Sequence, residues 1–210
     1  MSLKLEAQFD FLFQTYFGGK GDELDRFISR AYRDMNRTLS GMGKQKDKSD
    51  ILNGAKEVVR QQLNDLIRTS PEKAKLGDQF EHWHSTACKK LKEFYDSRDT
   101  NPKINFTYGQ AQKWINMTMK YCWVCGGNEL ERLQPWFVKA HVAVDEVILI
   151  AAEKEKVVSN RPCEKWSKWD SEQEYSDFQK TLREVATTQN KSPMELEFDW
   201  WNKYRSELNE

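Results

Sequence analysis

Apolar residues spaced three or four positions apart recur along almost the whole chain, and this periodicity constrains the fold more than any other feature. Seven segments carry such a stripe: 5–17, 24–35, 52–67, 76–94, 107–125, 175–185 and 196–204. The short apolar run 147–152 fits a strand or a helix, and we expect a helix because no second strand-like run could pair with it. The sequence therefore predicts an all-α fold of about eight helices, with a tryptophan-rich core and little or no β structure.

A chain of 210 residues fits one domain, and we expect residues 1–210 to form a single compact unit. The helical pattern breaks at Ser97–Asn105, where Asp99 and Pro102 interrupt it. A subdivision into N-terminal helices (1–98) and C-terminal helices around the segment 107–125 (105–210) is compatible with this break.

Composition narrows the classes of partner. The 33 basic and 33 acidic residues balance to a formal net charge of zero, which disfavours non-specific nucleic-acid binding. No apolar run approaches the roughly 18 residues needed for a membrane span, and no apolar stretch follows a basic start within 1–18. We therefore expect a cytoplasmic protein whose four cysteines are reduced thiols, with no membrane partner.

Several helix starts are marked by capping residues. Thr107, Ser171 and Ser192 are each followed three positions later by Gln or Glu, as in a capping box. Ser70-Pro71 combines an N-cap residue with a proline suited to the first helical position, and predicts the start of the fourth helix.

The segment 107–125 predicts a mostly apolar helix with one narrow polar stripe. At 100° per residue, Gly109, Gln112, Lys113, Asn116 and Lys120 fall within about 100° of one another. Ammonium and amide donors suit a phosphate or a carboxylate, and a glycine permits close approach of a ligand or another backbone. The alternative is that this stripe is simply the solvent-exposed face of a core helix.

His141 and Asp145 are four residues apart and would share a face if their segment were helical. A histidine oriented by a carboxylate is a general acid/base arrangement. Against this stands a structural interpretation, an aspartate at a helix N-terminus beside a partly buried histidine. If Asp145 faced Lys113 or Lys120, the two features would merge into one polar network.

Metal binding and base stacking are two further hypotheses. Two short pairs together form a potential zinc set: His84 with Cys88, and Cys122 with Cys125. Buried cysteine is, however, also a common small apolar residue.

Four tryptophans form either a stacking platform or packing for the loop 159–170 and the last helix: Trp166, Trp169, Trp200 and Trp201.

The favoured function is a binding or interaction module for a small anionic ligand or a protein partner, held at Gln112, Lys113, Asn116 and Lys120. The alternative is a small enzyme acting on a phosphate-containing substrate, with His141 and Asp145 as the acid/base pair and the lysines stabilising charge. A zinc-stabilised scaffold is the third interpretation. No nucleotide-binding or metalloprotease motif occurs, so we expect no cofactor.

Overall fold

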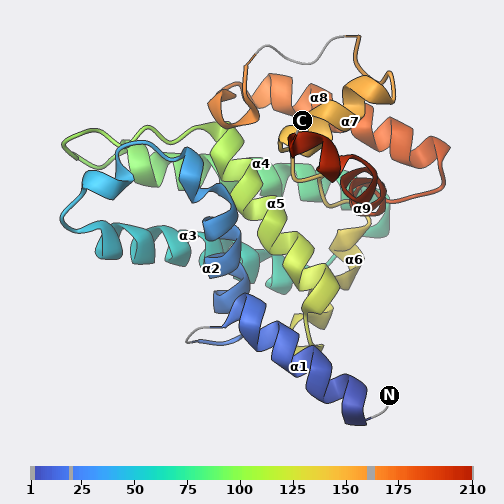
Figure 1. Ribbon diagram of the computed structural model, residues 1–210, viewed down its shortest axis with the longest axis horizontal. Coiled ribbons are helices and arrows are strands. Elements are labelled where there is room, and N and C mark those ends of the chain that lie inside the picture. Colours follow the sequence, from blue (N-terminus) through green and yellow to red (C-terminus); the bar gives the residue numbers. More distant parts are fainter. Residues whose placement is uncertain (1–2, 19–20, 160–163, 210) are drawn as a thin grey trace.

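A single helix, α5 (Tyr108–Cys125), lies at the centre of the computed structural model, with the other helices arranged around it (Figure 1). The structure describes residues 3–18, 21–159 and 164–209. These ranges contain nine α-helices and short 3-10 turns, which confirms the predicted all-α class. The only β pairing in these ranges is an isolated bridge between Ser40 and Asn105.

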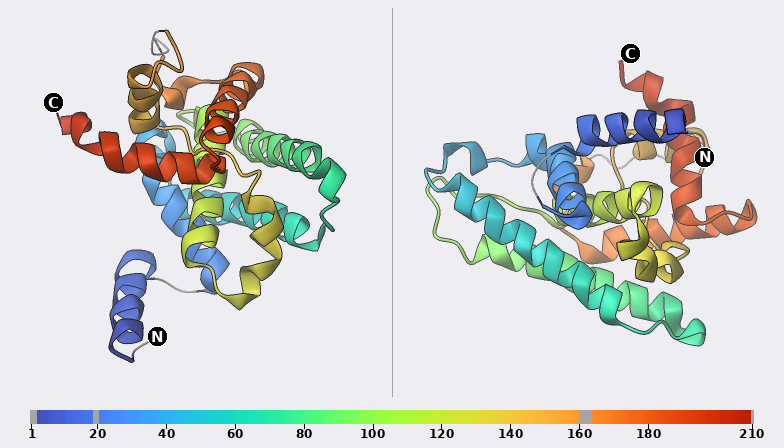
Figure 2. Two further views of the ribbon diagram at one scale, coloured as in Figure 1. Left: turned by 90° about the vertical axis from the view of Figure 1, so that its right-hand side faces the viewer. Right: turned by 90° about the horizontal axis from the view of Figure 1, so that it is seen from below.

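The helices preceding α5 form the first half of the fold. They are α1 (Leu3–Phe17), α2 (Glu23–Met35), α3 (Lys48–Arg68) and α4 (Leu76–Asp96). α2 and α4 pack against α5, and α3 runs beside α4 (Figure 2). α1 projects from the body and contacts α2 near one end of α5 (Figures 1 and 2).

The helices after α5 cover its other side. They are α6 (Gln134–Phe137), α7 (Glu146–Lys154), α8 (Glu172–Thr188) and α9 (Pro193–Tyr204). Three 3-10 turns are important below: η1 (Asn36–Thr38), η5 (Trp166–Lys168) and η6 (Arg205–Asn209). The helix predicted at 147–152 is confirmed as α7. All nine helices belong to one compact fold, and no helix in the described ranges is both long and apolar enough to span a membrane.

The N-terminus of α5 is fixed by its own sequence. Thr107 and Gln110 form the predicted capping box, each side chain bonding the backbone N–H of the other. Gly109 lets another backbone approach closely: its N–H donates to the Trp169 carbonyl at 2.8 Å. A Cβ at this position would lie 2.0 Å from the Trp166 carbonyl oxygen, so only glycine fits against η5.

Of the other predicted helix starts, two are confirmed and one is wrong. Ser192 caps α9 with a full capping box, and Ser171 caps α8 by accepting from the Glu174 N–H. The start predicted at Ser70-Pro71 is wrong, because α4 begins at Leu76 after a 3-10 turn. The apolar stripe of α4 begins only at Leu76, so an earlier helical turn would bury nothing.

Candidate functional site

The polar stripe of α5 does not face solvent. Gln112 and Asn116 are fully buried, Lys113 is 5% exposed, and the Lys120 side chain is mostly covered. The interpretation of this stripe as a solvated helix face is therefore wrong. A polar stripe buried inside a protein must find hydrogen-bond partners there, and those partners determine what the stripe does.

One partner is the buried, non-helical segment 140–145 between α6 and α7. The side-chain amides of Gln112 and Asn116 each donate at 3.2 Å, to the carbonyls of Val144 and Val142. The Lys113 ammonium donates to the Ala143 carbonyl at 3.2 Å. The stripe therefore satisfies backbone groups that an irregular buried segment cannot pair within itself.

Side chains from α8 and α9 bond the same segment from the other side. Gln179 accepts from the Val142 N–H at 3.1 Å and donates to the Val142 carbonyl at 2.7 Å. Fully buried Glu197 accepts from the Ala143 N–H at 3.0 Å, and its second oxygen pairs with Lys120. The amides of Gln112 and Asn116 consequently have no group left for a ligand, and we exclude them from the candidate site.

Lys113 also forms the ion pair with Asp145 that joins the polar stripe of α5 to the predicted His141–Asp145 segment. Its ammonium lies 2.8 Å from an Asp145 carboxylate oxygen, and the other oxygen accepts from the Ile148 N–H at 3.1 Å as the N-cap of α7. Burial raises the pKa of Asp145, but the adjacent Lys113 charge outweighs it and leaves that pKa lowered. The structural interpretation of Asp145 as a helix cap is confirmed.

The predicted pairing of His141 with Asp145 is wrong. Residues 141–145 are not helical, so the four-residue spacing does not place the two side chains on one face. The carboxylate that orients His141 comes from α4, where Glu81 accepts from His141 Nε2 at 3.0 Å. Burial raises the Glu81 pKa, but His141 and Arg183, which lies at 2.6 Å, lower it to about 2.

His141 belongs to a buried hydrogen-bond network with one consistent direction. Because the Asn116 amide oxygen can only accept, His84 Nε2 donates to it at 2.8 Å. The Asn116 amide donates to the Tyr175 hydroxyl at 2.8 Å, and that hydroxyl donates to His141 Nδ1 at 2.9 Å. Burial lowers the pKa of both His84 and His141, so both imidazoles are neutral at pH 7.

A small cavity of about 250 Å³ adjoins this network. All three histidines of the chain line it, together with Glu81 and Glu172. None of the described lysines lines this cavity. The enzyme alternative requires His141 Nε2 and a lysine ammonium to meet in one cleft, and the described residues do not provide that arrangement.

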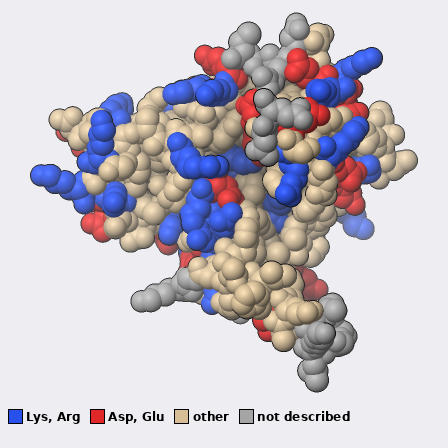
Figure 3. Space-filling view, viewed as in Figure 1, with Lys and Arg blue, Asp and Glu red and all other residues tan. Residues whose placement is uncertain are grey.

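The lysines instead line a larger groove of about 890 Å³ on the opposite side of α5. Its residues come from α1, α2, α5, α9, the start of α7 and the three 3-10 turns η1, η5 and η6. On this face of the molecule, Lys and Arg side chains gather around the middle, above the apolar surface of α1 (Figure 3). Five cations line the groove with three carboxylates: Arg30, Arg33, Arg37, Lys113 and Lys120, with Asp34, Asp145 and Glu146.

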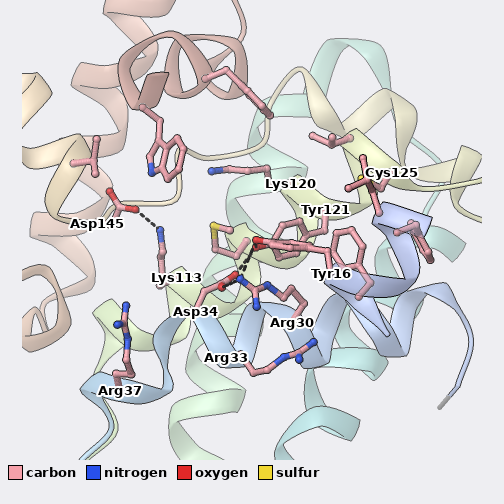
Figure 4. A pocket seen from close by; sticks show the side chains of 18 of the residues that line it. Tyr16, Arg30, Arg33, Asp34, Arg37, Lys113, Lys120, Tyr121, Cys125 and Asp145 are labelled. Atoms are coloured by element: carbon pink, nitrogen blue, oxygen red, sulfur yellow. Dashed lines mark hydrogen bonds and ion pairs between the residues drawn. The ribbon is translucent and has the colours of Figure 1, made fainter. Parts of the chain in front are cut away.

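Most of these charges are already engaged inside the protein. Arg30 pairs with Asp34 at 3.0 Å, and Asp34 also accepts from the Tyr121 hydroxyl (Figure 4). Arg33 and Arg37 differ, because both are exposed and neither has a hydrogen-bond or ion-pair partner in the described part of the chain. Both lie on the α2 side of the groove, and Arg37 points toward the Lys113–Asp145 pair (Figure 4).

The zinc set is not assembled. Cys88 lies 3.8 Å from the His84 ring, but among the described residues no three His, Cys, Asp or Glu side chains are placed to hold one metal ion. Cys88, Cys122 and Cys125 are free thiols, whereas Cys163 lies outside the described residues. Burial raises the pKa of the Cys88 and Cys122 thiols, which fits apolar packing.

Three of the four selected tryptophans pack into the core. Trp166, Trp169 and Trp200 are buried, in agreement with the packing interpretation. Trp201 is 37% exposed and lines the groove. Arg33 and Arg37 were not among the site residues predicted from sequence, although the spacing of Arg30, Arg33 and Arg37 indicates one cationic face beside the apolar stripe of α2.

No known protein family, curated protein or solved structure matches this chain.

Proposed function

We propose that this chain is a binding protein that holds an anionic ligand in the groove between α1, α2, α5 and α9. The observation that carries the proposal is a pair of exposed arginines, Arg33 and Arg37, which have no side-chain partner among the described residues and line a groove that also contains Lys113 and Lys120. Guanidinium groups match the geometry of carboxylate and phosphate oxygens, and a groove of about 890 Å³ has the size of a small-molecule site.

The roles within the groove differ. The arginines would contact the anion directly, because no internal partner competes for them among the described residues. Lys113 and Lys120 would contribute positive charge from the floor while remaining bonded to Asp145 and Glu197. Gln112 and Asn116 would support the site only indirectly, by holding the segment 140–145.

The test uses the arginines, because replacing Lys113 would leave a largely buried Asp145 without its cation. Thermal unfolding and titration calorimetry are recorded with pyrophosphate for the parent, for Arg33→Ala/Arg37→Ala, and for Arg68→Ala. Arg68 is an exposed arginine at the end of α3, outside the groove, and its replacement controls for the loss of a surface arginine charge elsewhere.

We expect pyrophosphate to stabilise the parent and Arg68→Ala equally. The double variant should bind at least about tenfold more weakly, since hydrogen bonds to charged groups contribute about 1.5–3 kcal/mol each. Equal stabilisation of all three proteins would place the anion elsewhere. No stabilisation of any of them would contradict an anion site in the groove.

A further inference from the structure

The apolar part of the groove is as distinctive as its charge. Nine large hydrophobic side chains are exposed in the described residues, and seven of them line this groove. The seven come from four elements that converge on it: Phe9, Leu12, Tyr16, Val124, Phe198, Trp201 and Leu208. Exposed apolar residues scattered singly need no explanation, but a contiguous concentration in one groove marks a binding surface.

Arg37 and the apolar side chains of α1 lie toward different ends of the groove, and Arg30 lies between them with its guanidinium 4.0 Å from the centre of the Tyr16 ring (Figure 4). Lys113 and Val124 both line it from α5 and are eleven residues apart, so they lie about 16 Å apart along the helix axis. Arg37 points toward the Lys113 end, whereas α1 packs near the other end of α5 (Figures 1 and 4). A ligand that satisfies both ends must therefore be elongated, anionic at one end and apolar along the rest.

We infer that the ligand is a single-chain anionic amphiphile, a molecule with one carboxylate or phosphate group and one hydrocarbon chain. This inference rests on the proposed anion site and adds the apolar half. The volume of about 890 Å³ lies within the range of small-molecule pockets. A nucleic acid would need a larger excess of cations than five against three carboxylates.

In this arrangement the head group meets Arg37 near the Lys113 charge, Arg33 adds positive charge from α2, and the chain lies over Met117 and Val124 between α1 and Trp201. Chain burial makes a quantitative prediction. Each methylene transferred from water to an apolar surface improves affinity by up to about fourfold, so two methylenes should improve it by up to about sixteenfold.

Calorimetric titrations of octyl, decyl and dodecyl phosphate, each below its micelle concentration, test the inference. We expect the Kd to fall at least fivefold for each two added carbons, and decanol to bind far more weakly than decyl phosphate. Leu12→Ser should weaken dodecyl phosphate about tenfold while leaving pyrophosphate binding unchanged. Phe11→Ser is the matched control, because Phe11 is 69% exposed on the same helix but does not line the groove.

The outcomes separate the inference from the proposed function. Arginine-dependent binding of pyrophosphate without any gain from chain length would overturn the amphiphile and leave the anion site standing. Failure of every phosphate to bind would overturn both, whereas decanol binding as tightly as decyl phosphate would overturn the amphiphile alone. Binding to anionic phospholipid vesicles but not to monomeric alkyl phosphates would show a membrane-surface site instead, and would also overturn the inference.

Discussion

The two sides of α5 use polar residues in opposite ways. Toward the segment 140–145, the amides of Gln112 and Asn116 are buried and every polar atom has a partner within the protein. Toward the groove, Arg33 and Arg37 have no partner among the described residues and lie near exposed apolar side chains. Buried polar groups that are fully hydrogen-bonded within the protein help to specify its fold. Charged side chains without an internal partner, beside exposed apolar surface, can instead bind a ligand.

Gly109→Ala is expected to have the largest effect on stability among the variants that test this comparison. The added Cβ would lie 2.0 Å from the Trp166 carbonyl oxygen, so η5 or α5 must move. We expect a loss of about 3 kcal/mol or more in unfolding free energy, measured by urea denaturation. Gly77→Ala, on α4 with open space around the new Cβ, is the control and should stabilise by about 0.5–1 kcal/mol.

Asn116→Leu tests whether the buried amides are structural. Leucine has the same number of heavy side-chain atoms and the same branching, but His84 Nε2 and the Val142 carbonyl each lose a hydrogen-bond partner. We expect a loss of about 2–3 kcal/mol in urea unfolding, with pyrophosphate affinity unchanged for the folded fraction. A stable variant that loses pyrophosphate binding would instead return Asn116 to the ligand site.

The neutral histidines predict a loss of stability in mild acid. Burial lowers the pKa of His84 and His141, so the unfolded chain binds more protons below about pH 6.5 and unfolding is favoured there. Each histidine contributes at most about 1.4 kcal/mol per pH unit, and we expect a loss of about 2 kcal/mol between pH 7.5 and 5.5. Urea unfolding across this range measures it.

The ionisable groups that contact these histidines do not reverse the expected loss of stability in mild acid. Glu81 pairs with His141 and stays ionised, because its pKa is lowered to about 2. The Tyr175 hydroxyl bonds His141 and remains protonated, because burial raises its pKa. Exposed His82 is the control position, so His82→Asn should keep the same pH dependence. A flat stability between pH 7.5 and 5.5 would contradict a buried, neutral histidine pair.

The smallest effect on stability is expected for the groove itself. Leu12→Ser removes a side chain that is 63% exposed, so the unfolding free energy should change by less than about 0.5 kcal/mol. Thermal unfolding measures this change. A loss above about 2 kcal/mol would show that Leu12 packs in the core, and would remove the distinction between the two sides of α5.

Local pattern was sufficient for much of the fold. Apolar spacing predicted the helices, and the capping boxes at Thr107 and Ser192 placed two of their starts. The role of Gly109 in a close approach also followed from its position on the stripe, although sequence left open whether a ligand or a backbone would approach. These features depend on residues within one or two helical turns, so their physics is contained in short segments.

The candidate site could not be predicted in the same way, because it is formed by contacts between segments that are distant in sequence. His141 and Asp145 share no helix face, and their actual partners, Glu81 and Lys113, lie 60 and 32 residues away in sequence. Gln112 and Lys113 are neighbours in the stripe, but only the path of the segment 140–145 over α5 decided that one is enclosed and the other reaches the groove.

The sequence by itself thus determined that the central helix carries a polar stripe, and the tertiary structure decided what that stripe contacts. Periodicity gives the direction of a side chain relative to its own helix axis. It carries no information about which element lies in that direction, because loop paths such as segment 140–145 follow from the packing of the whole chain. The exposed arginines of the groove and its apolar surface between α1 and α9 follow only from that packing.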